Sequence, residues 1–156
     1  MQLLDGRGSW ARQAVITGGL LCFAAIARGQ TLSVSGSPAN LVINTAIAGQ
    51  PPTSDNDATT TYTVKALNKN NPLKITGRLN AAMPPGMTLT ISLAPPGGAV
   101  SNGTVTLDAT TRDLVGDITN SNAQTRSITY TLSATAAAGV VPPQSRTVTL
   151  TITAWP

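Results

Sequence analysis

The sequence predicts an all-β domain built from two packed antiparallel sheets. Residues 145–154 end in an alternation of threonine and apolar side chains, which gives a strand one hydroxyl face and one apolar face. The same alternation recurs along most of the chain after residue 30, and clusters of Gly, Pro, Asn and Ser separate the repeats. One polar face on each strand argues against a parallel sheet, whose strands are buried on both faces.

Each expected strand is a run of alternating apolar positions bounded by turn-forming residues. About seven to nine strands fit this description, which favours a sandwich of immunoglobulin-like type that lacks the Cys–Trp–Cys core of antibody domains. In chain order, the expected strands are Leu32–Val34, Asn40–Ala46, Thr60–Leu67, Leu73–Leu79, Met87–Leu93, Val105–Leu107, Leu114–Thr119, Ile128–Ala134 and 145–154.

The alternation also predicts which side chains form the core. On each expected strand the apolar positions share one face, and that face is the one to be buried. The inward side chains should include Tyr62, Val64, Leu89, Ile91, Ile128, Tyr130, Leu132, Val148, Leu150 and Ile152.

The connections between the strands carry strong turn signals. Ala48–Ala58 contains Gly, Pro, Ser, Asp and Asn and is expected to be a loop, as is Ala94–Gly103. The pair Asn102–Gly103 predicts a tight hairpin turn, and it also opens a formal glycosylation sequon with Thr104. Gly77 interrupts an apolar strand and is a candidate for a β-bulge.

Residues 1–29 have the layout of a secretory signal peptide, with Arg7 and Arg12 preceding the uncharged apolar stretch Ala14–Ala27. Small residues place cleavage before Arg28 or Gln30, so residues 30–156 form the predicted domain. The alternative is an uncleaved membrane anchor, although the stretch is short for a helix that spans a bilayer. We therefore expect an exported protein that is periplasmic, at the cell surface or extracellular, with no stable membrane span once the leader is removed.

The composition of residues 30–156 excludes several classes of function. This region has no His, Cys or Glu, so it lacks the usual general base, the thiol nucleophile and most zinc ligands. Its seven basic side chains and five aspartates give a net charge of +2, without the dense basic stripe and stacking aromatics of nucleic-acid binders. We expect a disulfide-free domain that is not an enzyme, needs no cofactor and binds no nucleic acid.

Two residue groups are candidates for a binding role. Asp55 and Asp57 place oxygen ligands of the kind that calcium prefers in a loop flanked by prolines, although the full calcium-binding loop is absent. The favoured alternative is a solvated turn in which these carboxylates bond to nearby backbone. Trp155 is either a ligand-stacking residue or, more often for a lone tryptophan, a side chain that covers the edge of a core.

The run Arg146–Trp155 resembles the final strand of archaic chaperone–usher pilins of the spore-coat-U type, which are secreted bacterial β-sandwich subunits. The short run Thr31–Ser35 is similar to a pilin donor strand. Together these two runs make up about fifteen residues. The resemblance implies a pilus, envelope or matrix subunit whose partners are other protein chains, including copies of itself.

Two classes of function follow from these observations. The first is a structural or surface protein that assembles through its sheet edges, because pairing of strand edges uses only backbone hydrogen bonds. The second is a secreted binding module that holds a glycan, an envelope polymer or a protein through the loops Ala48–Ala58 and Ala94–Gly103.

Overall fold

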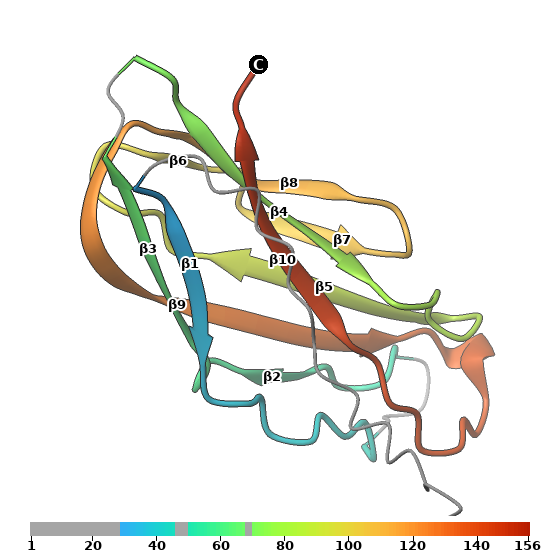
Figure 1. The fold of residues 1–156 in the computed structure, drawn as a ribbon. Helices are drawn as coiled ribbons and strands as arrows, with labels where there is room; N and C mark the ends of the chain where they lie inside the picture. Colours follow the sequence, from blue (N-terminus) through green and yellow to red (C-terminus); the bar gives the residue numbers. More distant parts are fainter. Residues whose placement is uncertain (1–28, 46–49, 68–69) are drawn as a thin grey trace, which may run out of the picture.

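The computed structural model describes residues 29–45, 50–67 and 70–156, and within them it confirms the all-β prediction (Figure 1). Two antiparallel sheets are packed face to face, and the only helical element among these residues is the short 3-10 helix η1 (Ala136–Ala138). The strands are β1 (Thr31–Ser35), β2 (Asp55–Asp57), β3 (Thr61–Leu67), β4 (Leu73–Leu79), β5 (Met87–Leu93), β6 (Val100–Ser101), β7 (Thr104–Leu107), β8 (Arg112–Ile118), β9 (Asn120–Ala134) and β10 (Val148–Ala154).

The larger sheet has six strands in the order β1-β3-β9-β5-β7, with β2 added beside β9. The smaller sheet has four strands in the order β10-β4-β8-β6. The long strand β9 organises the larger sheet, because its first half pairs with β3 and its second half pairs with β5 on one side and with β2 on the other. In Figure 1, β10 crosses in front of β5 and β9, so the smaller sheet lies nearer the viewer.

The core lies between the sheets and contains most of the expected side chains. Seven of the ten expected inward residues are buried: Tyr62, Val64, Leu89, Ile91, Ile128, Tyr130 and Leu132. The other three, Val148, Leu150 and Ile152, face the core but are only partly buried. These three side chains are less buried than predicted, because β10 lies at the edge of its sheet and has a neighbouring strand on one side only.

The expected strand Asn40–Ala46 is absent from the described residues 40–45, and Ala46 lies outside the described part. This segment is held mainly by two bonds: the Val42 amide donates to Asp55 Oδ2 at 2.8 Å, and the Thr45 carbonyl accepts from the Thr53 amide at 2.9 Å. Leu41 and Ile43 still pack against the core, so the apolar alternation is real. The segment is nevertheless not a strand, because no neighbouring strand pairs with it.

Two connections and one strand position differ from the prediction. The expected loop Ala48–Ala58 contains β2, which pairs with the second half of β9. Asn102–Gly103 joins β6 of the smaller sheet to β7 of the larger one, so it is a crossing between sheets and not a hairpin turn. Gly77 is in register with both neighbours, and the register shifts of β4 lie at residues 73–76. At Gly77 an added Cβ would lie 2.7 Å from Leu114 Cδ1, so the close packing of Leu114 explains why this position is a glycine.

Trp155 attaches the end of β10 to the smaller sheet. Its amide donates to the Pro72 carbonyl at 2.8 Å, and its indole lies against Gly116 so closely that a Cβ added there would be 2.4 Å from Cζ3. Lys74 Nζ lies 5.8 Å from the ring centroid and also bonds to Asp113 at 3.1 Å. Trp155 therefore packs on the inner strands β4 and β8 of the smaller sheet, which is a structural role for this residue.

The predicted leader, residues 1–29, lies outside the described residues except for Gly29, so the signal-peptide expectation stays a prediction. Among the described residues, no helix has the length and hydropathy to span a bilayer.

Candidate functional site

One long side of the sandwich is closed. The chain passes from β5 to β6 and then to β7, and so links the two sheets directly. Ser101 Oγ of β6 donates to the Leu93 carbonyl of β5 at 3.0 Å, although β6 pairs with β8 of the other sheet. Leu107 and Leu114, which lie beneath this crossing, are 2% and 1% exposed.

The opposite side, called the open side below, is bordered by the edge strands β1 and β10, which lie beside each other without pairing (Figure 1). In β1, Leu32 and Val34 pair with the buried Val64 and Tyr62, so they point to the core side of the sheet. Val34 is nevertheless 49% exposed, because few side chains of the smaller sheet reach it. The core side of β1 therefore presents uncovered apolar surface.

The second edge strand, β10, has a free row of backbone groups. The amide of Asn80 donates to the Thr147 carbonyl, and the Trp155 amide donates to Pro72, so odd-numbered residues of β10 face β4 with their backbone groups. The amides and carbonyls of residues 148, 150, 152 and 154 therefore point away from β4. The side chains at the first three of these positions, Val148, Leu150 and Ile152, are apolar and half-buried.

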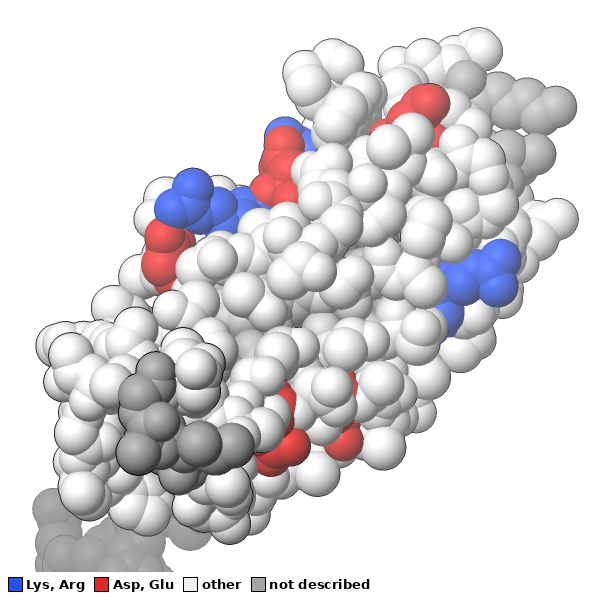
Figure 2. Space-filling view, turned by 180° about the vertical axis from the view of Figure 1, so that it is seen from behind, with Lys and Arg blue, Asp and Glu red and all other residues white. Residues whose placement is uncertain are grey.

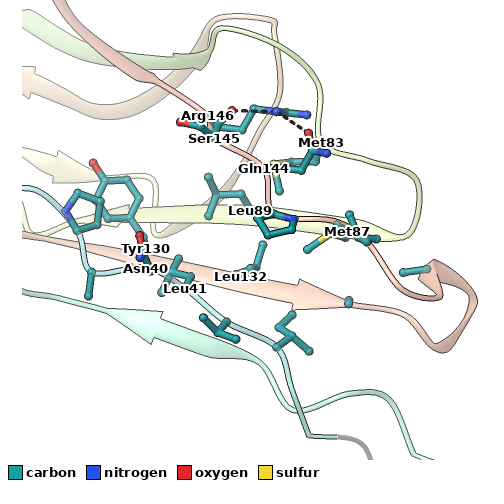
Figure 3. Close-up of a pocket in the computed structure, with 18 of the residues that line it drawn as sticks. Asn40, Leu41, Met83, Met87, Leu89, Tyr130, Leu132, Gln144, Ser145 and Arg146 are labelled. Atoms are coloured by element: carbon teal, nitrogen blue, oxygen red, sulfur yellow. Dashed lines mark hydrogen bonds between the residues drawn. The ribbon is translucent and has the colours of Figure 1, made fainter.

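A groove of about 1220 Å³ adjoins this open side, between residues 36–45 and residues 135–148 (Figure 3). Its floor is formed by apolar side chains of β5 and β9, and Leu41 approaches from the opposite wall. The lining residues labelled in Figure 3 are Asn40, Leu41, Met83, Met87, Leu89, Tyr130, Leu132, Gln144, Ser145 and Arg146.

Polar groups lie at separate places around the groove. The Arg146 side chain lies along one wall, where its Nε donates to the Ala82 carbonyl at 3.1 Å. Thr60 also lines the groove, and its Oγ1 is buried without a hydrogen-bond partner, which costs about 1–3 kcal/mol. Burial, together with the nearby Asp57 carboxylate, raises the pKa of Tyr130. Arg146, Thr60 and Tyr130 all belong to the lining of the groove.

A second tyrosine, Tyr62, has a structural role. Its hydroxyl donates to the Ala94 carbonyl at 2.6 Å and so attaches β3 to the connection that follows β5. Burial raises the pKa of Tyr62 to about 12, while the charge of Arg126 has a smaller opposing effect. Tyr62 therefore stays neutral at physiological pH.

The predicted calcium candidates Asp55 and Asp57 lie in β2, where both carboxylates have partners within the protein. Asp55 accepts from the amides of Val42 and Asn56 at 2.8 and 2.9 Å. Asp57 accepts from the amide and the hydroxyl of Thr59 at 3.1 and 2.9 Å. The Asp57–Thr59 bonds have the spacing of an Asx turn, but the solvated turn is corrected in two respects: both aspartates lie in a strand, and Asp57 is buried. No group of three His, Cys, Asp or Glu side chains that could hold a metal ion is present in the described part of the chain.

The outer face of the larger sheet is rich in hydroxyl groups. Figure 2 looks onto this face, and its Lys, Arg, Asp and Glu side chains lie toward the margins while the central area has none. In register across the strands, Thr63 faces Thr125 with their hydroxyl oxygens 2.8 Å apart, and Thr90 stands between Thr131 and Thr106. The centre of this face offers no cation for contacts with phosphate groups.

Sequence reasoning identified some of this site and missed the rest. It identified the edge strands β1 and β10 and placed Gln50 and Pro52, which line the groove, in a candidate binding loop. The second predicted binding loop, Ala94–Gly103, lies away from the groove. Thr60 and Arg146 as groove residues were missed, because no local pattern marks a residue whose neighbours come from distant strands.

Comparison of the chain with protein-family models, with curated proteins and with solved structures finds no match.

Proposed function

We propose that this protein is a non-enzymatic, exported structural or surface subunit that assembles through the open side of its sandwich. The observation that supports this proposal is the pair of edge strands β1 and β10, which combine unpaired backbone groups with apolar side chains that are only partly buried. Such an edge pairs readily with a strand from another chain, because that strand satisfies the backbone groups and covers the apolar surface. The partners are other copies of this chain or other envelope proteins.

Natural proteins that remain monomeric protect such edges with charges that point inward, with proline or with bulges. The two edge strands on the open side, β1 and β10, have no proline and no charged side chain: β1 is TLSVS and β10 is VTLTITA. Their outer faces carry threonine and serine, which add no electrostatic repulsion between copies. Edges without such protection are able to pair with a strand from another subunit.

The test is the oligomeric state of the exported full-length product, measured by sedimentation velocity over a range of micromolar concentrations. We expect concentration-dependent oligomers. The double variant Val34→Lys with Ile152→Lys places charges on the core side of both edges, and we expect it to weaken association by at least about tenfold.

The matched control is Ser33→Lys with Thr151→Lys, which adds the same charges one residue away, on the outer faces. This control should assemble as the unmodified protein does. Thermal melting of both variants reports whether they fold. A monomer at all concentrations, or equal effects of the two double variants, would contradict the proposal.

A binding module remains the second candidate function, and the groove beside the open side is the observation that favours it. The molecule that such a groove would accept is considered next.

A further inference from the structure

We propose that the groove between residues 36–45 and 135–148 binds an amphiphile with a flexible alkyl chain and a single anionic head group, and that the head group lies at Arg146. This inference goes beyond assembly through the sheet edges. It concerns a small molecule in the groove of a single copy, and it does not depend on whether the chain forms oligomers.

The apolar character of the groove comes first. Leu89 and Leu132, which pair with each other across β5 and β9, are 8% exposed and form the floor, and Met83 and Met87 lie beside them. Methionine side chains are flexible and polarisable, so they adapt to apolar ligands of varied shape. The volume of about 1220 Å³ is ample for an alkyl chain, because ligand pockets commonly measure roughly 300–1,000 Å³.

The floor offers no backbone edge, which distinguishes the groove from the neighbouring edge of β10. Residues 130–132 of β9 pair with β2 on one side and with β5 on the other. Residues 89–92 of β5 pair with β9 and with β7. A strand lying on this floor would gain no ladder hydrogen bonds from it, so the floor selects its occupant by apolar contact. This favours an alkyl chain over a peptide.

Arg146 supplies the charge complementarity. Its hydrogen-bond acceptors are all neutral oxygens: the carbonyls of Ala82 and Ser145, and Gln144 Oε1. No ion pair joins it to a carboxylate within the described residues, unlike Lys74 and Arg112, each of which has an aspartate partner. Figure 3 shows the Arg146 side chain on the wall above Leu89. A guanidinium in this position binds an anionic head group such as a carboxylate by charge-assisted hydrogen bonds.

Thr60 gives an independent sign of a ligand. Its side chain is 1% exposed, its Oγ1 has no partner, and the residue lines the same groove. Buried hydroxyls are normally paired, so this oxygen is an unsatisfied polar atom next to the groove.

The experiment is isothermal titration of the exported full-length protein with dodecanoate, below its micelle concentration, and with dodecanol as the uncharged counterpart. We expect saturable binding of dodecanoate at micromolar concentration. Arg146→Gln should weaken dodecanoate binding by about tenfold or more, and it should leave dodecanol binding unchanged. The matched control Arg78→Gln removes a charge from the exposed outer face of β4 and should affect neither ligand.

A second variant tests the alkyl part of the site without Arg146. Ala134→Phe adds a ring to the floor and should weaken both dodecanoate and dodecanol. Absence of saturable dodecanoate binding, or equal losses for Arg146→Gln and Arg78→Gln, would overturn the inference. Sedimentation of the same samples records the oligomeric state separately, so failure of ligand binding and failure of assembly are distinguishable.

Discussion

The two long sides of the sandwich are built from strands of similar pattern and reach opposite degrees of burial. On the closed side, the inward leucine of β7, Leu107, is 2% exposed beneath the crossing from β6. On the open side, the inward valine of β1, Val34, is 49% exposed. Both residues alternate with threonine or serine. The difference comes from their neighbours: the connection from β6 to β7 joins the two sheets on one side, whereas on the other side β1 and β10 lie beside each other without pairing.

This contrast separates what stabilises the monomer from what is available for partners. Apolar surface that is buried on the closed side contributes to folding, at roughly 25 cal/mol for each Å² removed from water. The half-exposed surface on the open side contributes only part of that amount within one chain. The remainder becomes available on association, which is why the assembly proposal rests on this side.

The sharpest test of the contrast compares one leucine from each side. Leu107→Ala should lower the free energy of unfolding by about 2–5 kcal/mol, because it removes a fully buried side chain and leaves a cavity. Leu150→Ala on β10 should cost about 1–2 kcal/mol, since that side chain is only partly buried. Thr149→Ala, on the exposed face of β10, should change stability by less than about 0.5 kcal/mol. Urea unfolding measures all three, and equal losses for the two leucines would show that the open side is covered in the monomer.

The next test concerns the attachment of the open edge by Trp155. Gly116→Ala places a methyl group where the indole lies, and overpacking of this kind should cost about 1–3 kcal/mol. In a Trp155→Ala background the same Gly116→Ala change should cost much less, because the clash is gone. Thermal melts of the four proteins in this double-mutant cycle measure the coupling. Additive effects would mean that the indole does not rest on Gly116 in solution.

The smallest effect is expected at the hairpin between β7 and β8, on the closed side. Hydrogen bonds from the Arg112 side chain, and then from the amide and hydroxyl of Thr110, lower the pKa of Asp108 to about 2 from an ordinary value of 3.8. A lowered pKa in the folded state stabilises the protein above the ordinary pKa, and this stabilisation is lost as pH falls from about 4 to about 2. Asp108→Asn should therefore flatten the acid side of the stability profile, measured by melting temperature between pH 2 and pH 5. An unchanged profile would show that the Arg112 pair is too exposed to matter.

Much of the fold was predictable, because it depends on local alternation. The runs at Tyr62–Val64, Leu89–Ile91 and Ile128–Leu132 bury the side chains that the pattern selected. The errors occurred where distant neighbours decide the outcome. Residues 40–45 have the alternation of a strand but no partner strand, and Asn102–Gly103 has the composition of a hairpin turn but crosses between sheets.

The candidate site was predictable only in part, for the same physical reason. The edge strands could be anticipated from their composition at the two ends of the predicted domain. The groove could not, because it is formed by segments that meet only after the sheets have paired, and Arg146 and Thr60 lie far apart in the sequence. An unpaired hydroxyl or a cation without a carboxylate partner becomes visible only in three dimensions.

The pairing of early strands with late ones also determines when the chain is able to fold. Thr63 of β3 meets Thr125 of β9 across 62 residues, and Thr76 of β4 meets Thr151 of β10 across 75 residues. Neither sheet is complete until the last third of the chain has been synthesised, and closing such long loops makes β-rich domains slow to fold. The polypeptide therefore emerges from the ribosome with both sheets incomplete, and neither core face is fully covered until β9 and β10 have been made.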